Sequence, residues 1–594
     1  MRDLFNVFFG FGDRRGKQVY DMVKTHDTFV NPNNPYNTTT TVNNRRELNG
    51  PCRSLNATAV IDRLFNGKLS QPENQTKSVL VTMSIGLISI FLGSLLLVYS
   101  PYEIMLRVKT TFVEGGEGYE MWRNPPVEVF LKVYLYNITN KEAFLAGKEK
   151  LKVQEVGPYV YREVGEHADA EFNHYNATVS AVPKYPLEWV PELSNGTEND
   201  ILVLPNVALL SFANVIAKAS SLTQIAVNLL IHQTNTQPIV EQTAKEFMFG
   251  YQSALVTLGN TFIPDWIYFD KLGLIDRMYD FTGDVSTTFS GEDNNHLSGI
   301  LATYNRLPYL PQWKAPCNKL QGSSDGTKFP TGIKNNESLS FFRKSLCRSM
   351  PMVRTGAMTT IHGIPTVHYR FKDDALDNGE RNQDNKCFCS NGHCLRSGLI
   401  DVTHCYYGFP IALSYPHFYQ ADPTLREEIE GSKPEQELHE TYFYLNPETG
   451  TPTKVSVKMQ INIALGDVSD MLHCEKFSNL VIPMLWTDIT MPELSQPIII
   501  KLFLLLRILP VIETIALYLF LIGGVAFVLL SICAVIFIST AKIPSQQNMK
   551  PSLMKNIVNN PRNDYLPQVK NDDNKEMEVY FTSLLAPTSD NEEV

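Results

Sequence analysis

Two long runs of uncharged residues constrain what this chain can fold into more than any other feature. Val79 to Ser100 and Thr514 to Thr540 contain no Asp, Glu, Lys or Arg. At ~1.5 Å per helical residue the first run is about 33 Å long, which matches about 30 Å of bilayer hydrocarbon. Helices buried in soluble cores are seldom this long and this apolar. The sequence therefore predicts two transmembrane helices, at residues 79–100 and 514–540.

The two spans divide the rest of the chain into three parts. The first span begins too far from Met1 to be an ordinary cleaved signal peptide, so we expect it to remain as an anchor. Residues 1–78 and the acidic, solvated tail 541–594 then lie on one side of the membrane, and residues 101–513 form a single large loop on the other.

A third apolar run, Ile201 to Gln233, is expected not to span the membrane. It carries one firm charge, Lys218, but several amides interrupt it. Its apolar residues recur at helical spacing, which predicts soluble helices with one apolar face. The residues assigned to that face are Leu209, Phe212, Ile216, Ala219, Leu222, Ala226 and Leu229.

Cysteines indicate which side of the membrane the loop occupies. Sequons occur in the loop at Asn137, Asn176, Asn195 and Asn336, but also before the first span at Asn37, Asn56 and Asn74, so they do not decide alone. An even set of cysteines clusters in the loop, which suits an oxidising compartment. We therefore expect residues 101–513 to be a glycosylated, disulfide-bonded ectodomain and both termini to be cytosolic.

The stretch CFCSNGHC, residues 387–394, is the densest chemical signal in the loop. Asn391-Gly392 predicts a two-residue hairpin turn, which places Cys389 opposite Cys394 with Cα atoms about 4.5 Å apart. A disulfide needs about 4.4–6.8 Å, so this pair is favoured and Cys387 is left for a distant partner. The alternative is a zinc site made by Cys387, Cys389, His393 and Cys394. The spacing and the oxidising compartment favour disulfides, so no metal and no cofactor is predicted.

Several function classes lack their sequence signals. The net charge of −10 and the absence of a basic stripe argue against nucleic acid as a partner. An ecto-enzyme is an alternative, but phosphate-binding loops and H-E-x-x-H are absent, and the one G-x-S-x-G, Gly322 to Gly326, has the polar flanks of a loop. A two-span ion channel subunit is a further alternative, but its spans would carry more polar residues. Cys474 is expected to be a buried free thiol.

Motifs along the whole loop resemble those of the class B scavenger receptor family, which includes fatty-acid translocases, lysosomal integral membrane proteins and insect croquemort-like receptors. The resemblance covers roughly residues 79 to 540, and each motif is weak when taken alone. In chain order the motifs are MWRNPPVEVFLKVYLYNITN (121–140), GPYVYRE (157–163), EFMFGY (246–251), LCRSM (346–350), CFCS (387–390), YPHF (415–418), PETG (447–450) and VIPMLW (481–486).

The resemblance implies an α+β membrane protein whose ectodomain has an antiparallel β-barrel core, a distal helical bundle at Ile201 to Tyr251 and an internal hydrophobic tunnel. It also implies disulfides that join Cys317 with Cys387, Cys347 with Cys405, and Cys389 with Cys394. The last of these pairs agrees with the hairpin argument, which used no knowledge of the family.

The implied function is that of a non-enzymatic receptor that binds lipid or lipoprotein particles and passes apolar ligand through the tunnel to the membrane. Leu209, Phe212, Ile216, Leu222 and Leu229 are the expected ligand-binding residues. The stretch LIHQTNTQPIVEQ has no lysine where the mammalian translocases carry lysines, so neutral lipid such as sterol or carotenoid is favoured beside fatty acid. A docking receptor for a protein or an apoptotic cell, without lipid transport, is the alternative.

The resemblance places the chain in the plasma membrane or in endosomal and lysosomal membranes. Tyr20 to Val23 fits a signal for an endocytic adaptor, although such tetrads arise often by chance. A homo-oligomer is compatible with these expectations.

Overall fold

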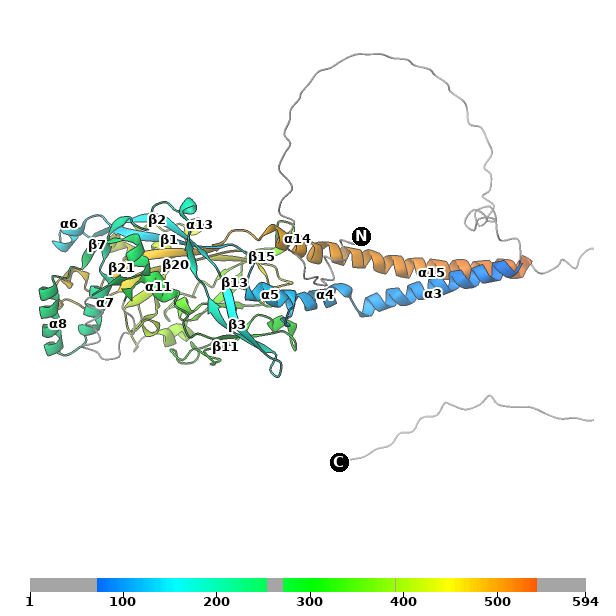
Figure 1. The fold of residues 1–594 in the computed structure, drawn as a ribbon, viewed down its shortest axis with the longest axis horizontal. Helices are drawn as coiled ribbons and strands as arrows, with labels where there is room; N and C mark the ends of the chain where they lie inside the picture. Colours follow the sequence, from blue (N-terminus) through cyan, green and yellow to red (C-terminus); the bar gives the residue numbers. More distant parts are fainter. Residues whose placement is uncertain (1–71, 254–270, 390–391, 542–594) are drawn as a thin grey trace, which may run out of the picture. The chain divides into compact units, whose positions relative to one another are not determined.

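The computed structural model describes residues 72–253, 271–389 and 392–541, and its centre is a sheet of thirteen strands (Figure 1). Nine strands follow one another along its main path, and all of these neighbours pair antiparallel except the last two. In spatial order they are β12 (Leu339–Phe342), β13 (Ser349–Arg354), β15 (Ile364–Phe371), β19 (Tyr442–Leu445), β20 (Pro452–Ala464), β21 (Val481–Met491), β1 (Val129–Ile138), β2 (Leu151–Glu163) and β18 (Ile429–Glu430). The branches are β14 (Thr359–Ile361), β16 (Ile400–Asp401), β17 (Ile411–Ser414) and β5 (Leu187–Trp189).

The expected closed barrel is not found among the described strands. The path begins at β12 and ends at β18, and these two strands do not pair with each other. β18 has two residues and pairs in parallel with the start of β2, so it offers few backbone groups for a further strand. The mixed α+β class and the large antiparallel sheet between the two apolar helices are confirmed. In the described part of the chain, however, the sheet is open and does not close into a barrel.

A second sheet and several short elements surround this core. The four strands of the second sheet lie in the order β11 (Leu301–Tyr304), β10 (Ser286–Phe289), β4 (Thr178–Lys184) and β3 (Glu166–Asn173). The short helices are α5 (Glu117–Arg123), α6 (Lys141–Leu145), α9 (Ala244–Phe249), α11 (Leu274–Met278), α12 (Thr424–Glu427) and α13 (Gln436–His439). The remaining short strands pair as β6 (Ile201–Pro205) with β7 (Ile239–Thr243) and β8 (Tyr251–Gln252) with β9 (Lys271–Leu272).

Strand β20 is buried on both of its faces. Apolar Val457, Met459, Ile461 and Ile463 alternate with polar Ser456, Lys458, Gln460 and Asn462, and all eight are buried. Side chains of successive strand residues point to opposite faces, so one face of β20 is apolar and the other is polar, and both are covered by protein. The central sheet therefore has a buried apolar layer on one face and a buried polar layer on the other.

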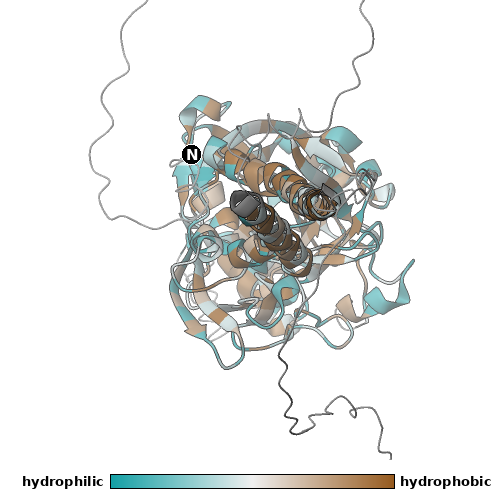
Figure 2. Ribbon diagram, turned by 90° about the vertical axis from the view of Figure 1, so that its right-hand side faces the viewer, coloured by the Kyte–Doolittle hydropathy of each residue, from teal (hydrophilic) through white to brown (hydrophobic). Residues whose placement is uncertain are grey.

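The two long apolar helices are α3 (Pro72–Val98) and α15 (Leu509–Ala541), and each is long and apolar enough to cross a bilayer. Figure 2 shows that apolar residues predominate along them. α3 is followed by α4 (Pro101–Thr110), whose N-cap is Ser100. α15 continues directly from α14 (Gln496–Phe503) through a π-helical turn, Leu504–Ile508. The predicted spans, 79–100 and 514–540, therefore lie almost wholly within α3 and α15, and the first ends two residues beyond its helix.

α3 and α15 pack against each other along their length (Figure 1). The Ser89 hydroxyl donates to the Phe520 carbonyl at 2.9 Å, and the Ser531 hydroxyl donates to Thr82 Oγ1 at 3.0 Å. Small residues let the two backbones approach closely, as is usual for helices paired in a membrane.

We predict that Gly524→Leu separates these helices, whereas Gly523→Leu does not. A Cβ atom on Gly524 would meet Ile90 Cγ1 at 2.8 Å and the Gly86 carbonyl oxygen at 2.9 Å, but a Cβ atom on Gly523 meets nothing within 4 Å. Overpacking of this kind costs about 1–3 kcal/mol. Thermal unfolding of the detergent-purified protein should show a lower midpoint for Gly524→Leu alone. Equal losses from both variants would contradict the packing described above.

The region Ile201 to Tyr251 contains strands as well as helices. Ile201–Pro205 is strand β6, and the predicted continuous helical face is split between α7 (Val207–Ile216) and α8 (Ser221–Thr234). Asn206 and Ser220 accept hydrogen bonds from the backbone N–H groups of Leu209 and Thr223, so each caps a new helix. In Figure 1, α7 and α8 lie at the end of the sheet domain opposite to α3 and α15.

Candidate functional site

Two motifs of the sequence meet at the central sheet beside a residue that lies just before a third. Glu155 lies on β2 just before GPYVYRE, His417 lies in the 3-10 turn Pro416–Phe418 of YPHF, and Trp486 ends VIPMLW on β21. The His417 Nε2 atom and the Trp486 Nε1 atom both lie 2.7 Å from Glu155 Oε2. Burial alone would raise the pKa of Glu155, but these two hydrogen bonds lower it overall. The carboxylate therefore ties three distant segments together.

Backbone groups determine the protonation of the two histidines at this point. The Lys433 N–H donates to His417 Nδ1 at 3.1 Å, so the proton of a neutral His417 is on Nε2 and is donated to Glu155. His439 lies near His417 with ring centroids 4.6 Å apart, and its Nδ1 accepts from the Glu435 N–H at 2.8 Å. Burial lowers the pKa of His439 to about 4. This geometry suits a structural network.

The polar layer behind the sheet is saturated with hydrogen bonds. Gln460 Oε1 accepts from the Tyr136 hydroxyl and from the His417 N–H, both at 2.7 Å. Gln460 Nε2 donates to Asn462 Oδ1 at 2.8 Å, and Asn462 Nδ2 donates to Ser414 Oγ at 3.1 Å. Buried polar groups that are fully paired specify one packing of their strands, so this layer fixes the position of β20.

The opposite, apolar face of the sheet borders a small cavity. Its volume is about 30 Å³. The cavity is lined by Met278, Phe341, Arg343, Ser345, Leu346, Leu413, Val457, Met459, Ile461, Thr487 and Ile489. It has room for roughly one or two water molecules but not for an alkyl chain.

A second and larger cavity lies across the segment Phe341 to Lys344. Its volume is about 160 Å³, and Phe342 and Lys344 line it, whereas Phe341 and Arg343 line the first cavity. Tyrosines contribute much of the rest of its lining, together with paired charges such as Lys344 and Asp284, whose Nζ and Oδ2 atoms are 2.5 Å apart. One short segment thus separates the two cavities.

The predicted ligand-binding residues fall into two groups. Leu209, Phe212 and Ile216 on α7 are buried in the main core. Leu222 and Leu229 on α8 are 80% and 57% exposed, and Ile225, which the sequence pattern did not single out, is 65% exposed between them. The spacing i, i+3, i+7 on α8 was the available signal. These three residues form an exposed apolar stripe, called the α8 stripe below, on a helix without Asp, Glu, Lys or Arg.

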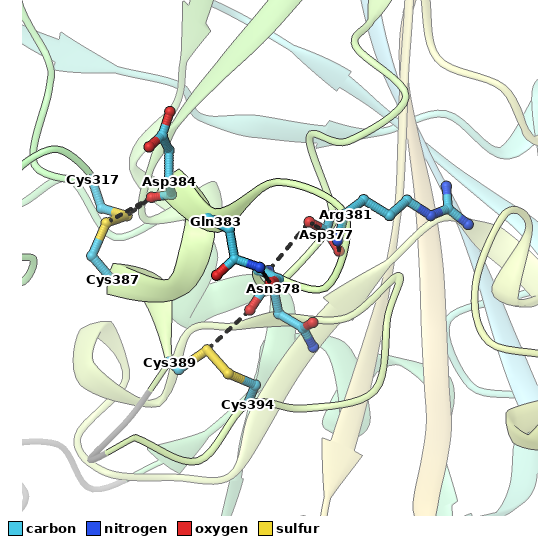
Figure 3. Close-up of a disulfide and its surroundings, with 10 residues drawn as sticks. Cys317, Asp377, Asn378, Arg381, Gln383, Asp384, Cys387, Cys389 and Cys394 are labelled. Carbon is cyan, nitrogen blue, oxygen red and sulfur yellow. Dashed lines mark hydrogen bonds between the residues drawn. A yellow bond between two sulfur atoms is a disulfide. The ribbon is translucent and has the colours of Figure 1, made fainter.

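Six cysteines form three disulfides, two of which are drawn in Figure 3. The pairs are Cys317–Cys387, Cys347–Cys405 and Cys389–Cys394, as the resemblance implies, and the Cα atoms of the last pair are 4.6 Å apart. A zinc site made from these cysteines conflicts with the pairing. Ser390 and Asn391, half of the expected turn, lie outside the described residues, and the sequence before it is a 3-10 helix, Gln383–Phe388, rather than a strand.

The four loop sequons differ in exposure. Asn176, Asn195 and Asn336 are exposed, whereas Asn137 is half-buried on β1, where its side-chain oxygen accepts from the Val203 N–H at 2.8 Å. The sequon asparagines Asn37 and Asn56, the residues Tyr20 to Val23 and the tail from residue 542 lie outside the described residues.

Cys474 is a free cysteine in the core. Burial, and then the charge of Glu475, raise the pKa of its thiol to about 12. The thiolate is therefore scarce at physiological pH, and Cys474 acts as a small apolar residue.

Comparison with known proteins shows one family. The model of the CD36 family matches residues 84–535. Scavenger receptor class B member 1 of Cricetulus griseus is 31% identical over 68% of this chain and 79% of its own. Lysosome membrane protein 2 of Homo sapiens is 30% identical over 64% of this chain and 78% of its own length. Protein peste of Drosophila melanogaster is 28% identical over 63% of this chain and 68% of its own length.

Proposed function

The chain belongs to the CD36 family of class B scavenger receptors, a non-enzymatic family, and from that premise we propose that it binds lipid or lipoprotein particles through α8 and moves apolar lipid to the bilayer. The chain is a two-span membrane protein of this family. Residues 101–513 would face the cell exterior or the lumen of a lysosome, with both termini in the cytosol. One relative named above is a lysosome membrane protein, which supports the lysosomal membrane as an alternative to the cell surface.

The α8 stripe is the observation that carries this proposal. Leu222, Ile225 and Leu229 expose large apolar side chains on one side of a helix at the end of the ectodomain far from the spans. Covering these apolar side chains with a lipid surface lowers the free energy of the system. A surface without charges selects for neutral lipid over anionic lipid. Sterols and carotenoids fit this requirement, because burial of their apolar surface supplies about 0.8 kcal/mol per CH₂ without a charged anchor.

The apolar interior of the central sheet supports the second half of the proposal. The small cavity lies against the apolar faces of β17, β20 and β21, and the larger one lies beyond the segment Phe341 to Lys344. In the described conformation both cavities are far smaller than a sterol. We therefore propose that passage of a lipid requires this segment to move, which would join the two cavities into the expected tunnel.

Leu222→Glu combined with Leu229→Glu is predicted to weaken binding of the protein to neutral lipid emulsions by about tenfold or more, because two charges replace apolar contact area. Flotation of the purified protein with emulsion particles of triolein and phosphatidylcholine measures the effect. Leu438→Glu, at a residue that is 56% exposed on α13, is the matched control and should float as the parent does. Unchanged flotation of the double variant would place lipid capture elsewhere.

A further inference from the structure

His167 and His296 are each held by two hydrogen-bond acceptors. The His167 Nδ1 atom is 2.8 Å from the Trp122 carbonyl oxygen, and its Nε2 atom is 3.2 Å from Asp325 Oδ2. The His296 Nδ1 atom is 2.7 Å from the Thr331 carbonyl oxygen, and its Nε2 atom is 2.8 Å from Glu337 Oε1. Carbonyl and carboxylate oxygens only accept, so both nitrogens of each ring must carry a proton to complete these bonds.

Only the imidazolium form of each ring can complete both of its hydrogen bonds. This is the opposite of His417 and His439, whose Nδ1 atoms accept from backbone N–H groups and must be bare. Loss of a proton from His167 or His296 would leave a bare nitrogen facing an oxygen, so one hydrogen bond is lost and two lone pairs face each other. Histidine charge changes between about pH 5 and 8, which is the range between endosomes and the cell surface.

Both histidines hold the same stretch of chain, residues 322–337. Asp325, Thr331 and Glu337 all belong to it, whereas His167 lies on β3 and His296 in the 3-10 turn Asn295–Leu297. The stretch packs in turn on the PETG motif, because the Phe329 and Gly332 N–H groups donate to the Gly450 and Glu448 carbonyls at 2.8 and 3.1 Å. Glu448 accepts a hydrogen bond from the Tyr102 hydroxyl on α4, next to the first span.

We propose that His167 and His296 form a proton-dependent clasp, which holds residues 322–337 to the ectodomain tightly at endosomal acidity and loosens as the pH rises. The carboxylates match this role. Asp325 and Glu337 each use one oxygen for the histidine and the other for the stretch itself, where the Thr327 N–H donates to Asp325 Oδ1 at 2.8 Å and the Lys334 N–H donates to Glu337 Oε2 at 3.0 Å. Releasing a histidine thus also frees the carboxylate that shapes the stretch.

The charged groups next to the two histidines do not produce the pH dependence proposed for the clasp. Burial alone would raise the pKa of Asp325, but the hydrogen bond and charge of His167 lower it overall. Burial lowers the pKa of Lys328 to about 7, and its ammonium donates to the Ser298 carbonyl at 2.7 Å. Lys328 contributes the opposite pH dependence of stability. Below pH 7 the folded state buries its positive charge, whereas water hydrates that charge in the unfolded state. The other ionisable groups next to the residues of the clasp are Arg123, which follows Trp122, Glu166, which precedes His167, and Lys334, whose N–H bonds Glu337.

Hydrogen exchange of the full-length protein in nanodiscs tests the proposal. Amide protection of residues 324–334, corrected for the intrinsic exchange rate, should fall by about tenfold or more from pH 5 to pH 8, while that of β20 should change little. His167→Gln combined with His296→Gln should lower the protection at pH 5 to the level of the parent at pH 8. Equal protection of the parent at both pH values would overturn the proposal.

A second double variant remains informative if the glutamine variant does not fold. In Asp325→Asn with Glu337→Gln, the carboxamide oxygen can keep the bond within the stretch while its N–H donates to the bare nitrogen of a neutral histidine. This variant should keep residues 324–334 protected at pH 8 and lose the pH dependence. A pH dependence equal to that of the parent would show that the two histidines are not its source.

Discussion

Replacing Arg343 with leucine is expected to lower the free energy of unfolding of the sheet domain by about 3–5 kcal/mol, because the buried Glu163 carboxylate loses its cation. Arg343 Nη2 lies 2.8 Å from Glu163 Oε2, and the two side chains are 13% and 5% exposed. Burial alone would lower the pKa of Arg343, but the charge of Glu163 raises it overall. The Tyr279 hydroxyl, which donates to the same oxygen at 2.8 Å, is left as a neutral partner that cannot balance the charge.

Arg162→Ala is the matched control for this prediction. Arg162 precedes Glu163 on β2 and pairs with Glu188 at 3.3 Å, but both side chains are about half exposed, so the pair contributes less than about 1 kcal/mol. Thermal unfolding and the fraction of protein that leaves the endoplasmic reticulum measure both variants. Adding Glu163→Gln to Arg343→Leu removes the unpaired charge and should recover part of the loss. If Arg343→Leu unfolds at the midpoint of the parent, this ion pair does not stabilise the sheet.

The features predicted well from the sequence are those set by local chemistry. The two uncharged runs lie in α3 and α15, because only a helix can satisfy its own backbone in a bilayer. The cysteine at 389 bonds with the one at 394 because a short turn leaves little choice of geometry. Neither argument needs to know what lies elsewhere in the fold.

The distal helices were predicted less well, although the signals that divide them are in the sequence. Asn206 and Ser220 are N-cap residues, and each starts a new helix within what the apolar spacing suggested was one face. Periodicity across a helix break carries no meaning, because the second helix points in its own direction. That is why Leu209 is in the core while Leu222 is in solvent.

The buried polar layer could not be predicted from local pattern. Alternation of apolar and polar residues on β20 ordinarily indicates a strand with one face in water, but here Gln460 and Asn462 are fully buried. Their partners come from distant parts of the chain, as do those of Glu155, which is 262 residues from His417 and 331 from Trp486. Only the fold brings such groups together, so the network appears once the strands are paired.

Met459→Trp is expected to reduce uptake of labelled sterol by cells at least about tenfold without reducing the amount of receptor at the surface. Met459 lies on the apolar face of β20 and lines the small cavity, whose volume is about 30 Å³. An indole at this position would fill the cavity and extend across the proposed route. Some loss of stability, about 1–3 kcal/mol from overpacking, is expected too, so surface biotinylation must accompany each uptake measurement.

Met459→Leu is the matched control, because it conserves volume and should leave uptake unchanged. Flotation with neutral emulsions distinguishes capture from transport, since Met459 lies on β20 and not on α8, so Met459→Trp should float as the parent does. Loss of uptake with intact flotation would support passage through the interior of the sheet. Intact uptake with equal surface expression would mean that lipid does not pass between β20 and the segment Phe341 to Lys344. The receptor would then capture particles at α8 and release them to another pathway, because a filled cavity cannot admit a sterol.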